Sequence, residues 1–202
     1  MTTLYQAPGA CSLAPLIALH VAGLPHDTQK VDLREHKLPD GSDYYAVNPK
    51  GAVPALRLDS GDVLTENGTL LQYIAEKAPN SGLIPANGLD RYRQLELLNY
   101  IATEVHKGFG PLFNASTPPK ARIMAIDNLS KKFSYLATLV SGRKFVAGDQ
   151  ITAADAYLFT VLRWTDLFKI DLSPWPALSA YRERVSNEPG VRAALAEEDL
   201  SR

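Results

Sequence analysis

Residues 3–23 have the sequence TLYQAPGACSLAPLIALHVAG, in which a strand pattern and a helix pattern are joined by a tight turn. Thr3-Leu4-Tyr5 is a β-prone run that ends before Pro8-Gly9. Over residues 12–21 apolar side chains recur every three or four positions, which predicts a helix with Pro15 in its first turn. Gly23 follows as the residue that ends this helix. A strand followed by a helix is the first half of an α/β unit.

The same alternation continues to about residue 80. A second strand is predicted near residues 27–32, a hairpin over residues 53–58 and 63–64, and another helix over residues 68–77. The order β-α-β followed by β-β-α predicts a mixed sheet with helices, as in a thioredoxin-like unit. We therefore expect an N-terminal domain over residues 1–80.

The rest of the chain carries helical patterns only. Proline and glycine residues between positions 79 and 88 mark a linker, which we place at residues 81–88. Beyond it, apolar stripes predict an all-helical bundle over residues 89–202. The expected helices cover residues 89–113, 120–139, 152–168, 177–186 and 191–197. The predicted fold class is α/β followed by all-α.

The composition is that of a globular protein. Hydrophobic residues make up 46% and charged residues 21% of the 202 positions, and the formal net charge is −1. Proteins that bind nucleic acids or anionic membranes normally carry a basic excess, so we expect neither partner. The single cysteine excludes an intrachain disulfide. No apolar run approaches the roughly 20 residues of a spanning helix, and no signal peptide is visible, which together favour a cytoplasmic location.

Cys11 lies at the turn between the first strand and the first helix. A helix N-terminus stabilises anions, and a cysteine placed there can have a lowered pKa and more thiolate at neutral pH. The alternative is a small buried hydrophobic side chain, and position alone favours neither interpretation. Because there is no Cys-x-x-Cys pair, a redox cycle between two thiols of one chain is excluded.

Two further segments of the first domain have features of a ligand site. Residues 48–56 read NPKGAVPAL, where Pro54 entering a strand indicates either a cis Val53–Pro54 bond or an ordinary loop before an edge strand. A strand edge at Val53 would pair with an extended peptide. Asn67 is expected to cap the second helix, and Glu66 beside it either holds an ammonium group or is a solvated carboxylate.

The long helix over residues 89–113 carries a polar stripe beside its apolar one. Asn99, Thr103, His106 and Gly110 are spaced four, three and four residues apart, so they share one face. This face either lines a cleft or is a solvated flank, and Lys107 adds a potential donor next to it.

Thr152 and Asp155 precede the apolar part of the third expected helix. The pattern is that of a capping box with aspartate in place of glutamate, in which each side chain bonds to the backbone of the other. We interpret this pair as structural, and such a cap contributes about 1 kcal/mol.

Together and in this order, these motifs resemble those of the bacterial beta-class glutathione S-transferases. The similarity extends from residue 3 to about residue 197. A cysteine after the first strand, where tyrosine or serine would indicate another class, is the most specific feature. The matching segments are residues 8–12, 48–56, 64–66, 98–109 and 152–159.

The resemblance implies a homodimeric glutathione transferase. Its first domain would bind glutathione, and its helical domain would bind small hydrophobic electrophiles that the glutathione thiolate attacks. Cys11 would also be able to form a mixed disulfide with glutathione and so exchange disulfides. No metal cofactor is expected.

The resemblance also implies site residues. The implied catalytic residues are Cys11, Ser12 and His106. The implied glutathione contacts are Ala10, Cys11, His36, Lys37, Ala52, Val53, Pro54, Glu66, Asn67, Asn99, Thr103, Glu104, His106 and Lys107. The implied electrophile contacts are Phe109, Phe113, Tyr157 and Trp164.

The chain departs from the family pattern at three positions. Gln6 stands where a tyrosine is usual, His36 where a lysine contacts the glycyl carboxylate, and Asn67 where serine or glycine is usual. Histidine is largely neutral near pH 7, so a weaker or pH-dependent hold on that carboxylate is implied, with Lys37 next to it. Asn67 still offers an amide hydrogen. The alternative to an enzyme is a non-catalytic binding or regulatory protein on the same fold.

Overall fold

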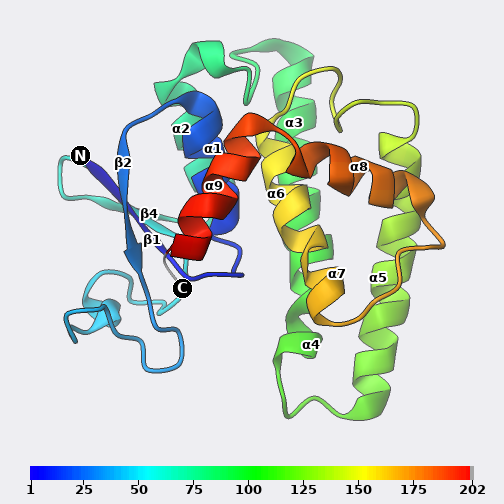
Figure 1. Ribbon diagram of the computed structural model, residues 1–202, viewed down its shortest axis with the longest axis horizontal. Helices are drawn as coiled ribbons and strands as arrows, with labels where there is room; N and C mark the ends of the chain where they lie inside the picture. The colour runs from blue at the N-terminus through cyan, green and yellow to red at the C-terminus, as the bar shows by residue number, and fades with distance from the viewer. Residues whose placement is uncertain (201–202) are drawn as a thin grey trace.

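The computed structural model describes residues 1–200; residues 201 and 202, at the end of the expected helical domain, lie outside the described part. Figure 1 shows a small sheet on one side of the molecule and a bundle of helices on the other. The strands are β1 (Thr2–Gln6), β2 (His26–Lys30), β3 (Ala55–Arg57) and β4 (Val63–Thr65). Their order is β2-β1-β3-β4, with β2 parallel to β1 and β3 antiparallel to both β1 and β4. The expected mixed sheet and hairpin are confirmed.

Two helices pack on this sheet. α1 (Leu13–Ala22) connects β1 to β2, and it is buried from Leu13 to Leu19 because α2, α6 and α9 surround it. It ends at Gly23, whose φ of 63° is the left-handed conformation that glycine adopts without strain. α2 (Asn67–Lys77) follows β4 and buries its apolar face. The short 3₁₀ helices η1 (Tyr44–Ala46) and η2 (Pro79–Ser81) lie in the connections.

The chain after residue 88 is helical, as predicted. The elements are α3 (Gly88–Tyr100), η3 (Ile101–His106), η4 (Lys107–Phe109), α4 (Gly110–Phe113), α5 (Pro119–Val140), α6 (Ala153–Leu162), α7 (Trp164–Leu167), α8 (Pro176–Ser186) and α9 (Pro189–Leu200). α6 is buried along its whole length and forms the centre of the bundle. The last helix, α9, returns to the sheet and packs against α1 (Figure 1).

The prediction of one regular helix over residues 89–113 is wrong in its middle. η3 is a π-helical turn and η4 is a 3₁₀ turn. At Gly108 the chain runs against α5, since a Cβ there would lie 2.8 Å from Leu129 Cδ2. The wider π turn also rotates the buried face, so that Ile101 is buried and Ala102 is only partly buried.

The helix expected over residues 152–168 is divided as well. α6 ends at Leu162, and α7 begins at Trp164. The Thr165 hydroxyl donates to the Leu162 carbonyl at 2.7 Å, and such a side-chain bond competes with the regular helical ladder.

The capping box at the start of α6 is confirmed. Asp155 does more than cap, because its completely buried carboxylate also accepts from the Val146 N–H at 2.9 Å and the Tyr181 hydroxyl at 2.8 Å. Burial raises the pKa of Asp155, and the hydrogen bonds to Thr152, Val146 and Tyr181 oppose this rise. The carboxylate thus joins α6, α8 and the loop before α6.

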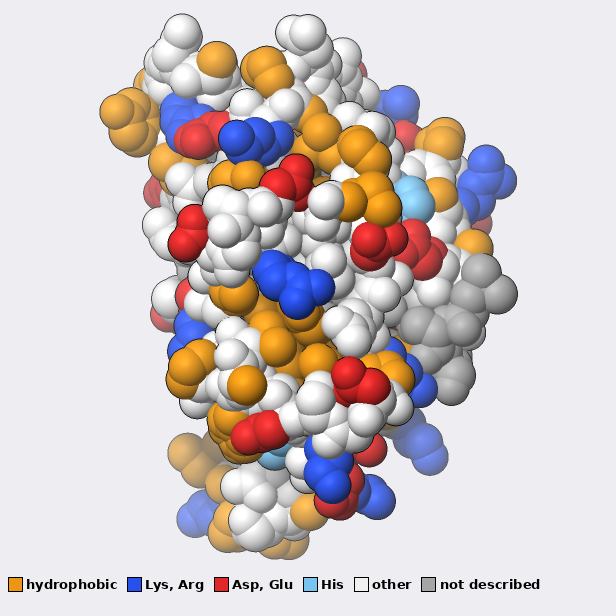
Figure 2. All heavy atoms as spheres, turned by 90° about the vertical axis from the view of Figure 1, so that its left-hand side faces the viewer, with side chains coloured by type: hydrophobic (Ala, Val, Ile, Leu, Met, Phe, Trp, Pro, Cys, Tyr) orange, Lys and Arg blue, Asp and Glu red, His pale blue; other side chains and the backbone are white. Residues whose placement is uncertain are grey.

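The surface agrees with the nearly neutral charge balance. Figure 2 shows basic and acidic side chains intermingled on the face that it presents, with hydrophobic groups between them. Within residues 1–200, none of the helices has the length and apolar character needed to cross a membrane.

Candidate active site

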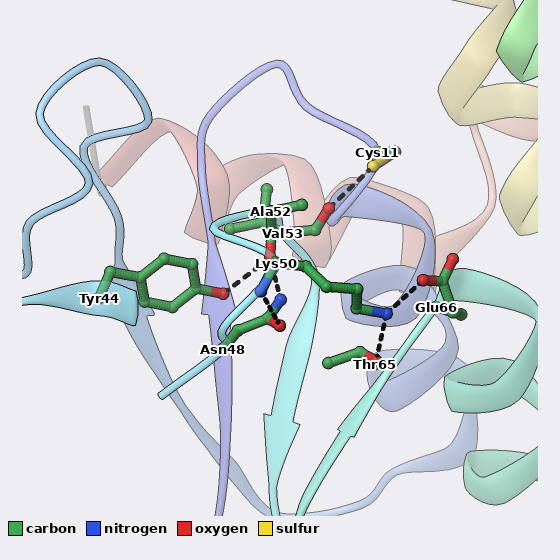
Figure 3. A network of polar contacts seen from close by, with 8 residues as sticks. All are labelled: Cys11, Tyr44, Asn48, Lys50, Ala52, Val53, Thr65 and Glu66. Carbon is green, nitrogen blue, oxygen red and sulfur yellow. Dashed lines mark hydrogen bonds and ion pairs between the residues drawn. The ribbon is translucent and has the colours of Figure 1, made fainter. Parts of the chain in front are cut away.

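The turn between β1 and α1 places Cys11 where the sheet meets the helical bundle. Ser12 is completely buried, and its hydroxyl accepts from the Ala7 N–H at 3.1 Å and donates to the Ala7 carbonyl at 3.2 Å. The Ser12 hydroxyl therefore holds the loop. Cys11 is partly exposed, and its thiol donates to the Val53 carbonyl at 3.3 Å (Figure 3).

Of the two interpretations of Cys11, the structure favours the buried side chain over the thiol with a lowered pKa. Burial raises the pKa of the thiol to about 11, and the hydrogen bond from Asn67 and the charge of Lys107 oppose this rise only in part. The cost of desolvating a thiolate here outweighs the benefit of the nearby helix N-terminus. In the free protein Cys11 is consequently a neutral thiol at pH 7.

The loop before β3 forms one wall of the site. The Val53–Pro54 peptide bond is cis, which confirms one of the two interpretations of the sequence. The Ala52 carbonyl accepts from the Tyr44 hydroxyl at 3.0 Å and from the Asn48 side-chain amide at 2.6 Å (Figure 3). These two donors hold the loop in place beside the thiol.

The start of α2 supplies charged groups. The expectation that Asn67 caps this helix is wrong, because Glu66, with a φ of 73°, occupies the cap position and Asn67 is already helical. The exposed Glu66 carboxylate forms an ion pair with the Lys50 ammonium, which also donates to the Thr65 hydroxyl at 2.7 Å (Figure 3). Glu66 therefore does hold an ammonium group, that of a lysine in the same chain.

Asn67 joins the two halves of the site. Its side chain lies beside the Cys11 thiol and the Tyr157 hydroxyl and acts to lower the pKa of both groups. The buried Asn67 Oδ1 has no hydrogen-bond partner within residues 1–200. The Tyr157 hydroxyl lies 2.6 Å from His106 Nδ1. Burial raises the pKa of Tyr157 and lowers that of His106 to about 4, so both side chains are neutral at pH 7.

These side chains surround a cavity of about 320 Å³ between the cis-proline loop, the start of α2 and the irregular helix η3–η4. The predicted contacts that line it are Cys11, Ala52, Val53, Pro54, Glu66, Asn67, His106, Lys107 and Tyr157. The lining residues that sequence reasoning missed are Asn48, Lys50, Thr65 and Ala102. Asn48 and Lys50 belong to the motif at residues 48–56, but no local pattern shows that Lys50 reaches Glu66. A larger hollow of about 530 Å³ between α3 and α5 lies away from the thiol.

Several of the predicted glutathione contacts do not line this cavity. Asn99, Thr103 and Glu104 are exposed, and Glu104 is paired with Lys132. Ala10 is partly buried and also does not line the cavity. The roles of these residues in glutathione binding stay predictions.

His36 and Lys37 are also absent from the wall. His36 Nδ1 lies 3.1 Å from the Gly51 carbonyl, to which it donates, and the ring packs against Tyr45 with 4.7 Å between centroids. Gly51 has a φ of +63°, and a Cβ on it would lie 2.6 Å from the Tyr45 ring, so only glycine fits this approach. Lys37 is exposed, and both roles stay predictions.

The aromatic residues expected to contact the electrophile differ in access. Phe109 is completely buried, and Trp164 is buried with its Nε1–H donating to the Gly9 carbonyl at 2.9 Å. Phe113 is 51% exposed and lies edge-on to the Trp164 ring, with 4.9 Å between centroids. Of these three, Phe113 therefore presents the most surface to a ligand.

A thioredoxin-like sheet unit joined to a helical bundle, with a thiol and a cis-proline at their boundary, defines the class of glutathione-transferase-like proteins. The family model for the N-terminal domain of glutathione S-transferases matches residues 9–77, and that for the C-terminal domain matches residues 100–189. The chain belongs to the glutathione S-transferase family, as its motifs predicted.

Individual relatives agree with this membership. The chain is 44% identical to glutathione S-transferase GstA of Escherichia coli O157:H7 over 98% of both chains. It superposes with a TM-score of 0.94 on a sphingomonad glutathione S-transferase complexed with glutathione, at 45% identity, covering 98% of this chain and 99% of that one. The bacterial beta-class enzyme of Sphingomonas chungbukensis gives the same TM-score and coverage at 42% identity.

Proposed function

We propose that this protein is a glutathione transferase that joins the glutathione thiolate to small hydrophobic electrophiles. The observation that carries the proposal is the cavity at the boundary of the two structural halves, which combines the backbone of the cis-proline loop, an ion pair and a cluster of neutral side chains. Glutathione has matching chemistry, because it is an extended peptide with charged ends and a central thiol.

The lining residues suggest how the peptide would lie. The cysteinyl backbone of glutathione would pair with the backbone of the cis-proline loop at Val53. Its γ-glutamyl ammonium would bind Glu66, and the adjoining carboxylate would lie near Lys50 and the N-terminus of α2. A ligand donor at Asn67 Oδ1 would satisfy a buried acceptor that otherwise lacks a partner within the described residues.

The reaction needs a thiolate. The glutathione thiol releases its proton to solvent, its sulfur forms a bond to the electrophilic carbon, and the leaving group departs with its electron pair. Each unit by which the site lowers the thiol pKa corresponds to about 1.4 kcal/mol. In the tautomer in which the Tyr157 hydroxyl donates to His106 Nδ1, the hydrogen of His106 lies on Nε2 and would be a donor for the sulfur. Lys107 adds a positive charge at the same cavity.

A second activity, disulfide exchange, rests on Cys11 lining the same cavity. The Cys11 thiolate would attack a glutathionyl disulfide, form a mixed disulfide and release the other thiol; glutathione would then attack it, giving oxidised glutathione and the free cysteine. The raised pKa of Cys11 leaves little of this thiol ionised at pH 7, which slows the attack on the disulfide.

The test compares both activities in wild type and in Cys11→Ala. We expect conjugation of 1-chloro-2,4-dinitrobenzene to be retained without the thiol, and glutathionyl-disulfide reduction to be abolished. Loss of both activities in Cys11→Ala would instead make the cysteine the nucleophile of a redox enzyme. If wild type shows no turnover and is not retained on immobilised glutathione, the non-catalytic alternative replaces both enzymatic proposals.

We also propose that the protein is a cytoplasmic homodimer that acts in detoxification, with residues 1–80 binding glutathione and residues 89–202 binding the electrophile. The family resemblance supports these assignments. Asn99, Thr103 and Glu104 are exposed in the single chain, which leaves their surface accessible to glutathione or to a second subunit. The exposed ring of Phe113 supports an electrophile site in the helical half.

A further inference from the structure

A second group of chemically active side chains lies where α1, β2 and α9 meet. His20 is in the last turn of α1, His26 is the first residue of β2, and Glu197 is on α9. One nitrogen from each ring and one carboxylate oxygen all lie within 4.8 Å of one another. None of these residues lines the cavity that contains Cys11.

His26 is held in an unusual state. Its Nδ1 lies 2.8 Å from the Leu24 carbonyl, which only accepts, so the hydrogen of the neutral ring is on Nδ1. The Nε2 lone pair is then buried, and it has no hydrogen-bond partner within residues 1–200. It faces Glu197 Oε2 at 3.6 Å. Two acceptors that face each other need a positive charge between them.

The distances favour a metal ion over a proton in this position. A hydrogen bond from nitrogen to oxygen is about 2.7–3.2 Å long, so 3.6 Å is too far. Tetrahedral ligands with bonds of about 2.0–2.1 Å lie roughly 3.3 Å apart, close to the observed separation. His20 Nε2 lies 2.7 Å from the same oxygen and would need to move only slightly.

The surroundings match those of metal ligands. The Thr28 hydroxyl donates to Glu197 Oε1 at 2.9 Å, and the Leu24 carbonyl orients the His26 ring. Side chains that bind metals are commonly held in place by hydrogen bonds of this kind. The side chains of His20 and Glu197 are 24% and 29% exposed, which gives an ion access.

We propose that His20, His26 and Glu197 bind a divalent transition-metal ion, with Zn²⁺ the ion that two imidazoles and a carboxylate suit best and water completing the coordination. No metal was expected from the sequence, because residues at positions 20, 26 and 197 form no local metal-binding motif. The ion would tie α9 to the sheet unit. The next residue of α9, Glu198, accepts from the Gly9 N–H at 2.9 Å, two positions before Cys11.

The experiment is a titration of chelator-treated protein with Zn²⁺ by calorimetry and with Co²⁺ by visible absorption. Both are done in the full chain carrying Cys11→Ala, so that the thiol cannot be a ligand. We expect one equivalent to bind, and the melting temperature to rise with metal concentration. His26→Gln and Glu197→Gln should each weaken binding at least tenfold. Glu188→Gln, which removes a carboxylate just before α9, is the matched control and should bind like its parent.

Two results would overturn the proposal. One is the absence of saturable binding of either metal ion. The other is equal affinity in Glu197→Gln and in its parent. Because the variants could fail to fold, crystals of the otherwise unaltered chain soaked in Zn²⁺ give a second readout: an anomalous peak between the two histidines and Glu197 is expected, and its absence at saturating metal contradicts the site.

Discussion

The neutral state of Cys11 predicts how its reactivity depends on pH. Roughly 3% of a thiol with the ordinary pKa of 9.0 is ionised at pH 7.5, whereas roughly 0.03% is ionised when the pKa is about 11. Since the thiolate is the nucleophile, alkylation of Cys11 at pH 7.5 should be about 100-fold slower than alkylation of an ordinary thiol. The rate should also rise about tenfold per pH unit from pH 8 to pH 10 without reaching a plateau.

The assay is alkylation of the single cysteine by iodoacetamide, followed by mass spectrometry over this pH range. The matched control is the same protein unfolded in urea, in which Cys11 loses its burial and its rate should level off above pH 9. Poor access alone would slow the native reaction at every pH but would not move the plateau. A native rate that levels off below pH 8 would refute the reasoning, because it would show that the helix N-terminus outweighs desolvation.

Other expected outcomes concern stability. Asp155→Ala leaves buried donors without an acceptor and should cost about 3 kcal/mol in urea unfolding; a loss below about 1 kcal/mol contradicts its role as a junction. The pKa of His106 falls from 6.5 to about 4 on folding, so between these pH values the unfolded chain binds the extra proton and stability declines as pH falls, by about 3 kcal/mol at most. His106→Asn should flatten that part of the urea-unfolding profile, and an unchanged profile argues against the shift. Trp164→Phe removes the bond to the Gly9 carbonyl and should cost about 1 kcal/mol of unfolding free energy, whereas equal stability would show that the bond contributes nothing.

Local patterns were sufficient for most of the fold. The strand at Thr3-Leu4-Tyr5 and the helix that ends at Gly23 depend on residues close together in sequence, so the sequence alone predicts them, whereas it left the cis bond at Pro54 as one of two alternatives. The capping box of Thr152 and Asp155 is equally local.

Features that depend on distant residues were missed. The π turn at η3 lies where Gly108 meets Leu129 of another helix, and a periodicity within one segment does not contain that contact. In the same way, the pKa of Cys11 depends mainly on the protein packed around it and on Asn67, so the position next to a helix N-terminus could not decide the direction of the shift.

In the candidate site, too, the features within one motif were predicted and those that join distant residues were not. Val53, Glu66 and His106 were predicted from motifs and do line one cavity. The ion pair between Lys50 and Glu66 was not predicted, because it joins two loops across 16 positions and no spacing rule relates them. A glutathione ammonium would have to share or displace Lys50 at this carboxylate.

The central claim is that glutathione occupies the cavity next to Cys11, and a crystal structure of the protein with saturating glutathione tests it most directly. We expect the cysteinyl backbone to pair with Val53, the γ-glutamyl group to contact Glu66 and Asn67, and the sulfur to lie near His106 without a covalent bond to Cys11. Glutathione bound elsewhere, or an empty cavity at saturation, would contradict the account.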